Sequence, residues 1–391
     1  MRIVIVGNGI AGLSAAEEIR KRNDQVEIHM ITQEKYYTYF RTQLSRFLAT
    51  EFKVEDIYLH PEQWYKERNI VVHLDSRVER IDPDSKRLFF NRQSMEYDRL
   101  LLATGAHSFL PPVKGKDKEG VFTLRDVEDL FRIQRFAKKV HKGMVIGGGL
   151  LGLEAAYALK KLGLDIQVVE VFDRLLPRQL DEEGSQVLRK IVEEQGVELL
   201  LESKVEDIVG DSIVKGCCLE DQGEVDTQLI LFSAGVRCNM QLAKEIGIEV
   251  DKGILVNENM QTSIRDIYAA GDACEYNNRF FGIWPIAMEQ GKIAGANMVG
   301  ERKAYKEITP SNMLQVMGTK VFSIGDIGAG EGEYSVIKEE NQEKNMYKKF
   351  FFNEGKLVGA ILINEISLSG RLKNLMGMEK TDLINRGLLS V

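Results

Sequence analysis

Two stretches of this chain, 140 positions apart, have the same layout. IVIVGNGIAGLSAA at 3–16 and MVIGGGLLGLEAA at 144–156 each lead from an apolar strand pattern through a glycine-rich turn into an alanine-rich helix pattern. A second apolar strand pattern follows in each copy, QVEIHMI at 25–31 and DIQVVEV at 165–171. Each copy is therefore predicted to form a β-turn-α-β unit, which is half of a doubly wound parallel sheet.

Both turns carry glycines in the G-x-G-x-x-G spacing. The first glycine permits a tight turn, the second lets the backbone approach a pyrophosphate, and the third lets the helix pack closely on the strand. The N-terminus of the following helix attracts the anion through its dipole and its N–H groups. Because both turns lie between a strand and a helix, the chain is predicted to bind two dinucleotides. The candidate cofactor-binding residues are Gly7, Gly9, Ala11 and Gly12 in the first turn, and Gly147, Gly149, Leu151 and Gly152 in the second.

Acidic residues after the second strand of each copy bear on the choice of cofactor. Glu170 lies 18 residues after Gly152, and a carboxylate there holds the adenosine ribose and repels a 2′-phosphate. NADH is therefore favoured over NADPH, although Arg174 could pair with that phosphate. Glu34, 22 residues after Gly12, is a candidate for the ribose of the first dinucleotide, and the alternative is a solvated loop charge.

The composition argues against several classes of protein. A chain of 391 residues with 44% hydrophobic and 28% charged residues is typical of a globular protein of more than one domain. The net charge of −7 argues against nucleic-acid binding, and no apolar run reaches the roughly 18 residues of a membrane span. The N-terminal MRIVIVG fits a buried strand rather than a secretory signal. Four cysteines, spaced neither as a C-x-x-C motif nor as a metal site, favour reduced thiols in a cytoplasmic protein: Cys217, Cys218, Cys238 and Cys274.

Two further motifs point to a known family. Together with the two glycine turns, LLLATGA at 100–106 and TSIRDIYAAGDAC at 262–274 resemble the FAD-dependent pyridine nucleotide-disulfide oxidoreductases, over about residues 1–300. The resemblance implies that FAD binds at the first turn and NAD(P)H at the second. It also implies that Asp272 holds a ribityl hydroxyl of FAD, and the alternative is an ordinary turn or helix-capping aspartate. The residues that it implies beside FAD in these two motifs are Ala103, Thr104, Gly105, Gly271 and Asp272.

Four more residues are assigned to the flavin by the same resemblance. Arg41 matches an arginine near the FAD diphosphate, and Arg46 stands where a lysine near the flavin ring is usual; the alternative for both is a solvated basic face. The backbone of Val78 matches an adenine contact, although a buried strand valine serves packing equally well. Trp284 begins a helix whose N-terminus is implied to face the flavin pyrimidine, and simple packing is its alternative.

Glu154 is the candidate catalytic residue. It stands in the second copy where the first copy has Ser14. The family resemblance implies that this glutamate lies near the nicotinamide carboxamide and orients the ring for hydride transfer to the flavin, a step that depends on alignment. The alternative is a solvent-facing glutamate on a helix.

The distribution of cysteines predicts where the electrons go. Residues 1–216 contain no cysteine, so the flavin is expected to deliver electrons outward rather than to an internal disulfide. A small one-electron carrier suits a flavin, which accepts a hydride and releases electrons singly. Within the family the chain looks most similar to NADH-dependent rubredoxin reductases and to the N-terminal module of NAD(P)H nitrite reductases. The stretches that carry this similarity are QEKYYTYFR at 33–41, LPRQLDEEG at 176–184 and ITPSNMLQVMGTKVFSIGDI at 308–327.

The expected architecture is an α/β flavoprotein with two Rossmann-like dinucleotide-binding domains and a small β-rich C-terminal domain. Residues 1–112 and 240–305 are expected to form the FAD domain, 113–239 the NAD domain and 306–391 the C-terminal domain. Neither a metal nor a nucleic acid is expected, and the oligomeric state is left open.

Several alternatives remain on sequence grounds. The acceptor could be rubredoxin, a ferredoxin, a nitrite reductase partner or oxygen, and a non-catalytic flavin redox sensor is the rival outside this class. Docking of the 367–380 segment on a membrane is a further alternative. The favoured interpretation is that the basic residues of this segment are solvated charges. Lys344, Lys348 and Lys349 are interpreted as charges on an exposed hairpin edge, the alternative being attraction of an acidic partner.

Overall fold

The structure, a computed structural model, describes residues 1–220, 222–328, 330 and 333–389. The chain divides into two compact units, each made of segments that are distant in the sequence. The first unit comprises Met1–Gln43, Phe52–Ser108 and Gly235–Ile308, and the second comprises Leu44–Glu51, Phe109–Ala234 and Thr309–Val391. The expected boundaries of the three domains stay a prediction.

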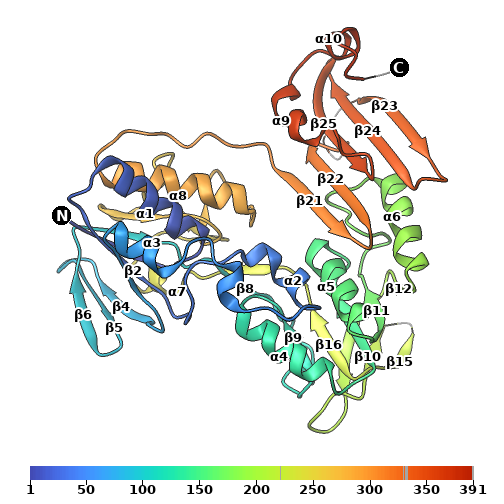
Figure 1. Ribbon diagram of the computed structural model, residues 1–391, viewed down its shortest axis with the longest axis horizontal. Helices are drawn as coiled ribbons and strands as arrows, with labels where there is room; N and C mark the ends of the chain where they lie inside the picture. Colours follow the sequence, from blue (N-terminus) through green and yellow to red (C-terminus); the bar gives the residue numbers. More distant parts are fainter. Residues whose placement is uncertain (221, 329, 331–332, 390–391) are drawn as a thin grey trace. The chain divides into compact units, whose positions relative to one another are not determined.

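The first unit is built around a five-stranded sheet in which all neighbouring strands are parallel (Figure 1). The central strand has fully buried residues at Ile3, Val4 and Ile5, as expected for a parallel sheet covered on both faces. The strand order is β19 (Ile267–Ala269), β7 (Arg99–Leu102), β1 (Arg2–Val6), β2 (Glu27–Ile31) and β3 (Ile70–His73).

Two helices that are far apart in the sequence, α1 (Ile10–Arg22) and α8 (Trp284–Met298), lie side by side in the first unit (Figure 1). Their contact is made by small residues. A Cβ atom built on Gly291 would lie 2.2 Å from the carbonyl oxygen of Ala11, and one built on Gly295 would lie 2.5 Å from that of Ala15. The backbones therefore approach so closely that only glycine fits on the α8 side.

The second unit contains a second five-stranded parallel sheet, in which four strands repeat the order of the first sheet. Its fifth strand, residues 121–123, precedes the others in the sequence, whereas β19 is the last strand of the first sheet. In it β10 takes the place of β1, and α5 (Leu150–Lys161) takes the place of α1. The strand order is β12 (Glu198–Leu200), β11 (Asp165–Val169), β10 (Lys142–Ile146), β16 (Leu229–Phe232) and β9 (Val121–Thr123).

The duplication also includes a three-stranded antiparallel sheet in each unit. Both of these sheets have a register shift in their first strand. They comprise β4 (Val78–Asp82), β5 (Arg87–Phe90) and β6 (Gln93–Glu96) in the first unit, and β13 (Val205–Val209), β14 (Gly216–Leu219) and β15 (Gly223–Asp226) in the second. The repeat seen in the glycine turns is therefore a repeat of whole nucleotide-binding folds.

Shorter elements complete both units. In the first, β8 (Ala106–Ser108) pairs with β17 (Val236–Cys238), and β18 (Ile254–Leu255) pairs with β20 (Cys274–Glu275). Its other helices are η1 (Arg41–Gln43), η2 (Val54–Ile57), α3 (Glu62–Glu67) and α7 (Gln241–Glu245). The second unit adds α2 (Leu44–Phe47), α4 (Val127–Ala137) and α6 (Glu182–Glu194).

The C-terminal part of the second unit is an antiparallel sheet with two helices, so the predicted fold class is confirmed. The hairpin expected at residues 346–363 is present, and Glu354 and Gly355 at its turn have φ values of +49° and +78°. The strand order is β21 (Ser311–Val316), β22 (Thr319–Gly325), β25 (Lys356–Ile363), β24 (Met346–Asn353) and β23 (Ser335–Asn341), and the helices are α9 (Ser369–Leu375) and α10 (Lys380–Asn385).

The interpretation of the tail lysines as charges on an exposed edge is wrong for Lys348 and Lys349. Both belong to β24, which is paired on one side with β25 and on the other with β23. Lys349 instead reaches across to α6, where its Nζ lies 2.7 Å from a carboxylate oxygen of Asp181. Lys348 pairs with Glu339 of the neighbouring strand at 3.2 Å.

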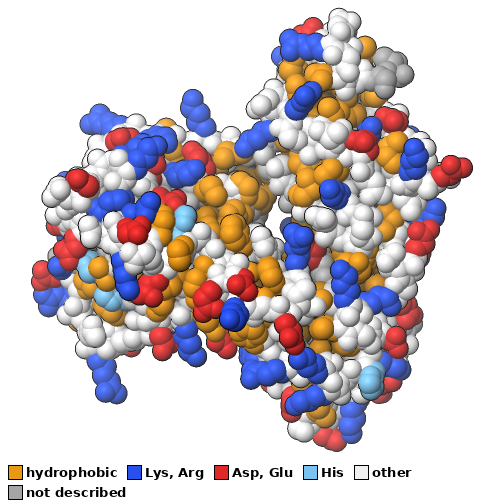
Figure 2. Space-filling view, viewed as in Figure 1, with side chains coloured by type: hydrophobic (Ala, Val, Ile, Leu, Met, Phe, Trp, Pro, Cys, Tyr) orange, Lys and Arg blue, Asp and Glu red, His pale blue; other side chains and the backbone are white. Residues whose placement is uncertain are grey.

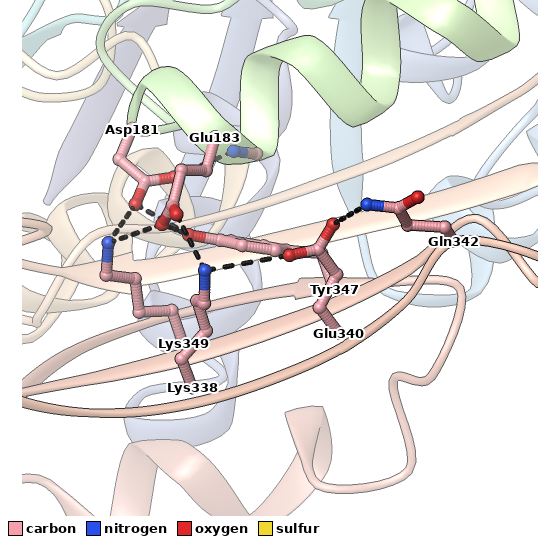
Figure 3. Close-up of polar contacts among 8 residues, drawn as sticks. Asp181, Glu183, Lys338, Glu340, Gln342, Tyr347 and Lys349 are labelled. Carbon is pink, nitrogen blue, oxygen red and sulfur yellow. Dashed lines mark hydrogen bonds and ion pairs between the residues drawn. The ribbon is translucent and has the colours of Figure 1, made fainter.

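A polar cluster joins the C-terminal sheet to the start of α6 (Figure 3). Asp181 caps α6 by accepting a hydrogen bond from the Gly184 amide, and it also accepts one from the hydroxyl of the buried Tyr347 at 2.7 Å. Hydrogen bonds from Lys338 and Lys349 lower the pKa of Glu183 to about 2. These paired charges fix the tail sheet on the second nucleotide-binding fold.

Two features of the described residues concern possible partners: the helices and the surface charges. No helix in this part of the chain has the length and apolar character that crossing a bilayer requires. On the face drawn in Figure 2, lysine and arginine side chains are interspersed with aspartate and glutamate.

Candidate functional site

The first glycine turn follows β1 and closes tightly on its neighbours. Gly7 has φ = +111°, and a Cβ atom on it would lie 2.1 Å from the carbonyl oxygen of Ala103. Its N–H donates to the carbonyl of Ile31 at 2.8 Å. A Cβ atom on Gly12 would lie 2.1 Å from the carbonyl oxygen of Gly7. Neither position therefore accepts a side chain.

The second turn, after β10, repeats this geometry. Gly147 has φ = +118°, its N–H donates to the carbonyl of Val169 at 2.8 Å, and a Cβ atom on it would lie 2.5 Å from the carbonyl oxygen of Ser233. A Cβ atom on Gly152 would lie 1.9 Å from the carbonyl oxygen of Gly147. The two turns thus share the same close approach of helix to strand.

The middle glycines, Gly9 and Gly149, differ from the others because they face open space. Each is the N-cap of its helix, has an extended conformation, and would have no atom within 4 Å of an added Cβ. Neither helix has a side-chain cap or an acidic residue in its first turn. The N–H groups at these helix N-termini are therefore arranged for an external anion, and the two turns fit the diphosphates of two dinucleotides.

Glu170 lies at the second turn, as predicted. Its buried carboxylate accepts hydrogen bonds from the backbone N–H of Gly148 at 2.7 Å and of Phe172 at 3.1 Å. Arg174, which could pair with the 2′-phosphate of NADPH, donates a hydrogen bond to the carboxylate of Asp173 at 3.1 Å. The carboxylate is therefore held at the end of β11, while the nearby guanidinium is engaged by its own neighbour.

Apolar side chains surround this second turn. Leu151 of α5 is 52% exposed, and Val171 and Phe172 after β11 are similarly exposed. Exposed apolar side chains at such a turn suit contact with the planar base and sugar of a ligand.

In the first unit the structure brings two predicted FAD contacts together. The carboxylate of Glu34 accepts hydrogen bonds from Arg41 at 2.5 Å and from the hydroxyl of Tyr39 at 2.7 Å. Only 19% of the Glu34 side chain is exposed, so the alternative of a solvated loop charge is wrong. The roles of Glu34 toward a ribose and of Arg41 toward a diphosphate stay predictions.

A small pocket lies where Gly271 meets the N-terminal part of α8, and Asp272 is among its lining residues. Gly271 has φ = +79°, donates its N–H to the side chain of Gln290 at 3.0 Å, and packs against Ala11 of α1. The buried Gln290 was missed by sequence reasoning, because the helix pattern at 284–298 also contains Glu289, Lys292 and Asn297 and does not single it out.

Trp284 begins α8, as expected. Pro285 follows at the second helical position, within the first turn, and the N-cap residue Ile283 supplies no side-chain cap. The indole of Trp284 stacks on Phe40, with ring centroids 6.2 Å apart. The N-terminus of α8 is therefore another helix end without a side-chain cap, beside the pocket that Asp272 lines.

The turn after β7 is held by a residue that sequence reasoning missed. The side-chain amide of Asn239 donates to the carbonyl of Thr104 at 2.8 Å, and the Thr104 hydroxyl donates to the carbonyl of Asn239 at 2.8 Å. The Asn239 N–H donates to Gly105, whose φ is +67°. The side chain of Val78 lies in the hydrophobic core of the same unit, so its predicted adenine contact concerns the backbone alone.

Glu154 is not a solvent-facing glutamate, so that alternative is wrong. It is half-buried on α5, and one carboxylate oxygen accepts a hydrogen bond from the hydroxyl of Ser45 on α2. Burial raises the pKa of Glu154, while the Ser45 hydrogen bond and the charge of Arg46 lower it. Arg46 therefore acts on the candidate catalytic carboxylate within the second unit, and its predicted flavin contact stays a prediction.

The four cysteines are unpaired, and three of them are buried. Burial raises the pKa of Cys217 to about 12 and that of Cys238 to about 11, and it also raises the pKa of Cys274. Thiols with such pKa values stay protonated at neutral pH and react slowly with disulfides and oxidants. Within the described residues no group of three or more His, Cys, Asp or Glu side chains is arranged to hold a metal ion.

Comparison with known proteins agrees with this geometry. Residues 1–291 match the family model described as pyridine nucleotide-disulphide oxidoreductase, and residues 310–380 match that of the rubredoxin NAD+ reductase C-terminal domain. The NAD(P)H nitrite reductase of Bacillus subtilis (strain 168) is 37% identical over 381 residues, which cover 97% of this chain and 47% of that protein. The chain spans about half the length of this and other curated relatives that it matches.

A rubredoxin-linked relative matches over nearly its whole length. The NADH-rubredoxin oxidoreductase of Clostridium acetobutylicum is 32% identical over 381 residues, which cover 97% of this chain and 95% of that protein. The crystal structure of NADH:rubredoxin oxidoreductase from the same species superposes with a TM-score of 0.82 and 30% identity, covering 99% of each chain. The resemblance inferred from the motifs is confirmed. The chain belongs to the pyridine nucleotide-disulphide oxidoreductase family, and membership of this family implies the use of FAD and NAD(P)H.

Proposed function

We propose that this chain is an FAD-dependent NADH oxidoreductase that passes electrons to a small one-electron carrier such as rubredoxin. The observation that carries the proposal is the pair of matching glycine turns, each with a middle glycine that faces open space at an uncapped helix N-terminus. A non-catalytic flavin sensor would need one such turn, whereas a reductase needs two. The tail that matches the rubredoxin NAD+ reductase C-terminal domain supports a carrier protein as acceptor.

The residues of this chain would bind and align the two dinucleotides. When bound, NADH supplies a hydride, and FAD accepts it and releases electrons singly. The first turn would hold the FAD diphosphate, with Asp272 on the ribityl chain. The second would hold NADH, with Glu170 on the adenosine ribose and Glu154 orienting the nicotinamide. No side chain is required as an acid or base in hydride transfer, so the contribution of the protein is alignment.

The choice of nicotinamide cofactor is testable at Glu170. Replacing Glu170 with Gln removes the negative charge that would repel a 2′-phosphate, and we expect the preference for NADH over NADPH to fall roughly tenfold. The ratio of the two kcat/KM values measures this preference. As a matched control, Glu198→Gln changes an exposed carboxylate on the neighbouring strand β12 and is expected to leave the ratio unchanged. An unchanged ratio in the Glu170 variant would contradict the assignment.

The cysteines are expected to be dispensable for electron transfer. Because the thiols of Cys217 and Cys238 are buried and their pKa values are raised, replacing either residue with Ser or Ala should leave the rate of NADH-dependent carrier reduction within about twofold of the wild type. The measurement is steady-state reduction of rubredoxin under anaerobic conditions. Loss of most of the rate in one variant, with its flavin content intact, would identify a redox-active thiol. We also propose that the protein acts in the cytoplasm, because its unpaired thiols suit a reducing compartment.

The acceptor is tested by a panel. Purified FAD-loaded protein is mixed with NADH and, in separate reactions, with oxidised rubredoxin, ferredoxin and oxygen. We expect rubredoxin to be reduced with the highest kcat/KM. Preferred reduction of ferredoxin, or turnover with oxygen alone, would replace the carrier named here and leave the flavin chemistry in place.

A further inference from the structure

One hydrogen bond near the second glycine turn joins residues that are far apart in the sequence. The hydroxyl of Ser45 donates to Oε2 of Glu154, which lies two residues after the last glycine of that turn. Ser45 is only 2% exposed, and Glu154 is half-buried. A half-buried carboxylate that accepts a hydrogen bond from a hydroxyl beside a proposed cofactor-binding turn is typical of a functional site rather than of an exposed surface.

The segment that carries Ser45 is firmly anchored to the same unit as Glu154. Residues 44–51 belong to the second unit, although the chain on both sides of them belongs to the first. Leu44 and Leu48 are buried, and the side-chain amide of Gln134 on α4 donates to the carbonyls of Phe47, Leu48 and Thr50 at 3.1, 3.0 and 3.0 Å. The side chain of Gln134 therefore ties the C-terminal end of α2 to α4.

We propose that Ser45 is a positioning residue that holds the Glu154 carboxylate in the orientation required by a nicotinamide bound at the second turn. This inference rests on the proposed function. With Oε2 engaged by Ser45, Oε1 is the oxygen that a carboxamide N–H of NADH would use. The anchor on Gln134 keeps α2 in place, so the serine sets the direction of the carboxylate before the cofactor arrives.

The charges around Glu154 are few. Arg46, on α2, acts on it directly. The elements packed against α5 are α2 and strands β10, β11 and β21, and β21 carries no ionisable residue. Lys142 of β10 pairs with Asp226, and Asp165 is at the exposed start of β11. On α5 itself, Lys161 lies over the ring of Tyr157.

The first test is the rate at which NADH bleaches the flavin in stopped-flow under anaerobic conditions. For Ser45→Ala we expect the rate at saturating NADH to fall about tenfold, because the hydrogen bond involves a charged acceptor, while the Kd for NADH and the flavin content change less than about twofold. Ser185→Ala is the matched control, since Ser185 is also buried in the second unit and donates to the carbonyl of Leu175. It should keep the wild-type rate.

A double variant separates positioning from general damage. If Ser45 acts through Glu154, then Ser45→Ala should slow the wild-type protein but have no further effect in the Glu154→Gln background. The inference would be overturned if the rate in the double variant fell by the product of the two single effects. It would also be overturned if Ser45→Ala kept the wild-type rate while Glu154→Gln was slow. A wild-type rate in Glu154→Gln also overturns it, and the proposed function then stands as long as NADH bleaches the flavin. If NADH does not bleach the flavin of the wild-type protein, both the inference and the proposed function are overturned.

A second readout does not depend on turnover. Infrared difference spectra between the wild type and Glu154→Gln, recorded against pH without NADH, report the protonation of this carboxyl group. The Ser45 hydrogen bond lowers the pKa of Glu154, so Ser45→Ala should move protonation to higher pH. Ser185→Ala should not. An unchanged protonation pH in Ser45→Ala would show that the serine does not hold the carboxylate.

Discussion

Replacing Gly149 with Glu is expected to give a folded, yellow protein whose affinity for NADH is lower by roughly 100-fold or more. Gly149 has an ordinary extended conformation, with φ = −77°, and no atom lies within 4 Å of an added Cβ. The fold therefore tolerates a side chain, and a carboxylate at a helix N-terminus even stabilises the helix. The same carboxylate would occupy the position intended for the NADH diphosphate and repel it.

The corresponding change in the first turn should prevent binding of the flavin and leave binding of NADH intact. Gly9 is also an N-cap in open space, with φ = −68°. Gly9→Glu is therefore expected to fold but to purify without flavin, while NADH still binds at the second turn. Flavin content is read from the visible spectrum, and NADH affinity from its fluorescence.

The matched control for both variants is Gly370→Glu. Gly370 lies on α9 of the tail, and no atom lies within 4 Å of an added Cβ there either. It adds the same charge and should change neither cofactor. If Gly9→Glu lost NADH and kept flavin, the assignment of the two turns would be reversed. If both variants kept both cofactors, the turns would not be diphosphate sites.

Replacing Gly291 with Val is expected to lower the free energy of unfolding of the first unit by about 3 kcal/mol and to release the flavin. The new Cβ would lie 2.2 Å from the carbonyl oxygen of Ala11, which is backbone and cannot rotate away. To relieve the clash, α8 and α1 must separate. Since Gly9 is the N-cap of α1, separation of the two helices displaces the turn proposed for FAD.

Urea unfolding followed by tryptophan fluorescence measures the loss, because Trp64 and Trp284 both lie in the first unit. Gly370→Val provides the control, since an added Cβ there has no atom within 4 Å, and this variant should change stability by less than about 1 kcal/mol. NADH binding at the second unit should survive in Gly291→Val. A variant of wild-type stability would mean that the helices can move apart at no cost.

Local sequence patterns were sufficient for the elements that depend on near neighbours. The two turns, their helices and the hairpin around Glu354 and Gly355 all follow from glycine spacing and apolar periodicity. The position of Glu170 at the second turn also followed from spacing, because the strand before it has a fixed length and direction.

Local sequence patterns could not predict contacts between segments that are distant in the sequence. Nothing near Ser45 in the sequence indicates that residues 44–51 join the second unit, since that depends on packing against α4 and α5. Asn239 and Gln290 fix the turns at Thr104 and Gly271 from more than 15 residues away. The lysines of β24 were misplaced for the same reason, because the order of strands in the tail sheet is a long-range property.

The most direct test of the central claim, that this chain carries electrons from NADH through a bound flavin, is an anaerobic titration of the purified protein followed in the visible spectrum. We expect a yellow protein without added flavin, bleached by NADH at far lower concentration than by NADPH, and reoxidised when oxidised rubredoxin is added. A colourless protein, or a flavin that NADH leaves oxidised, would contradict the account.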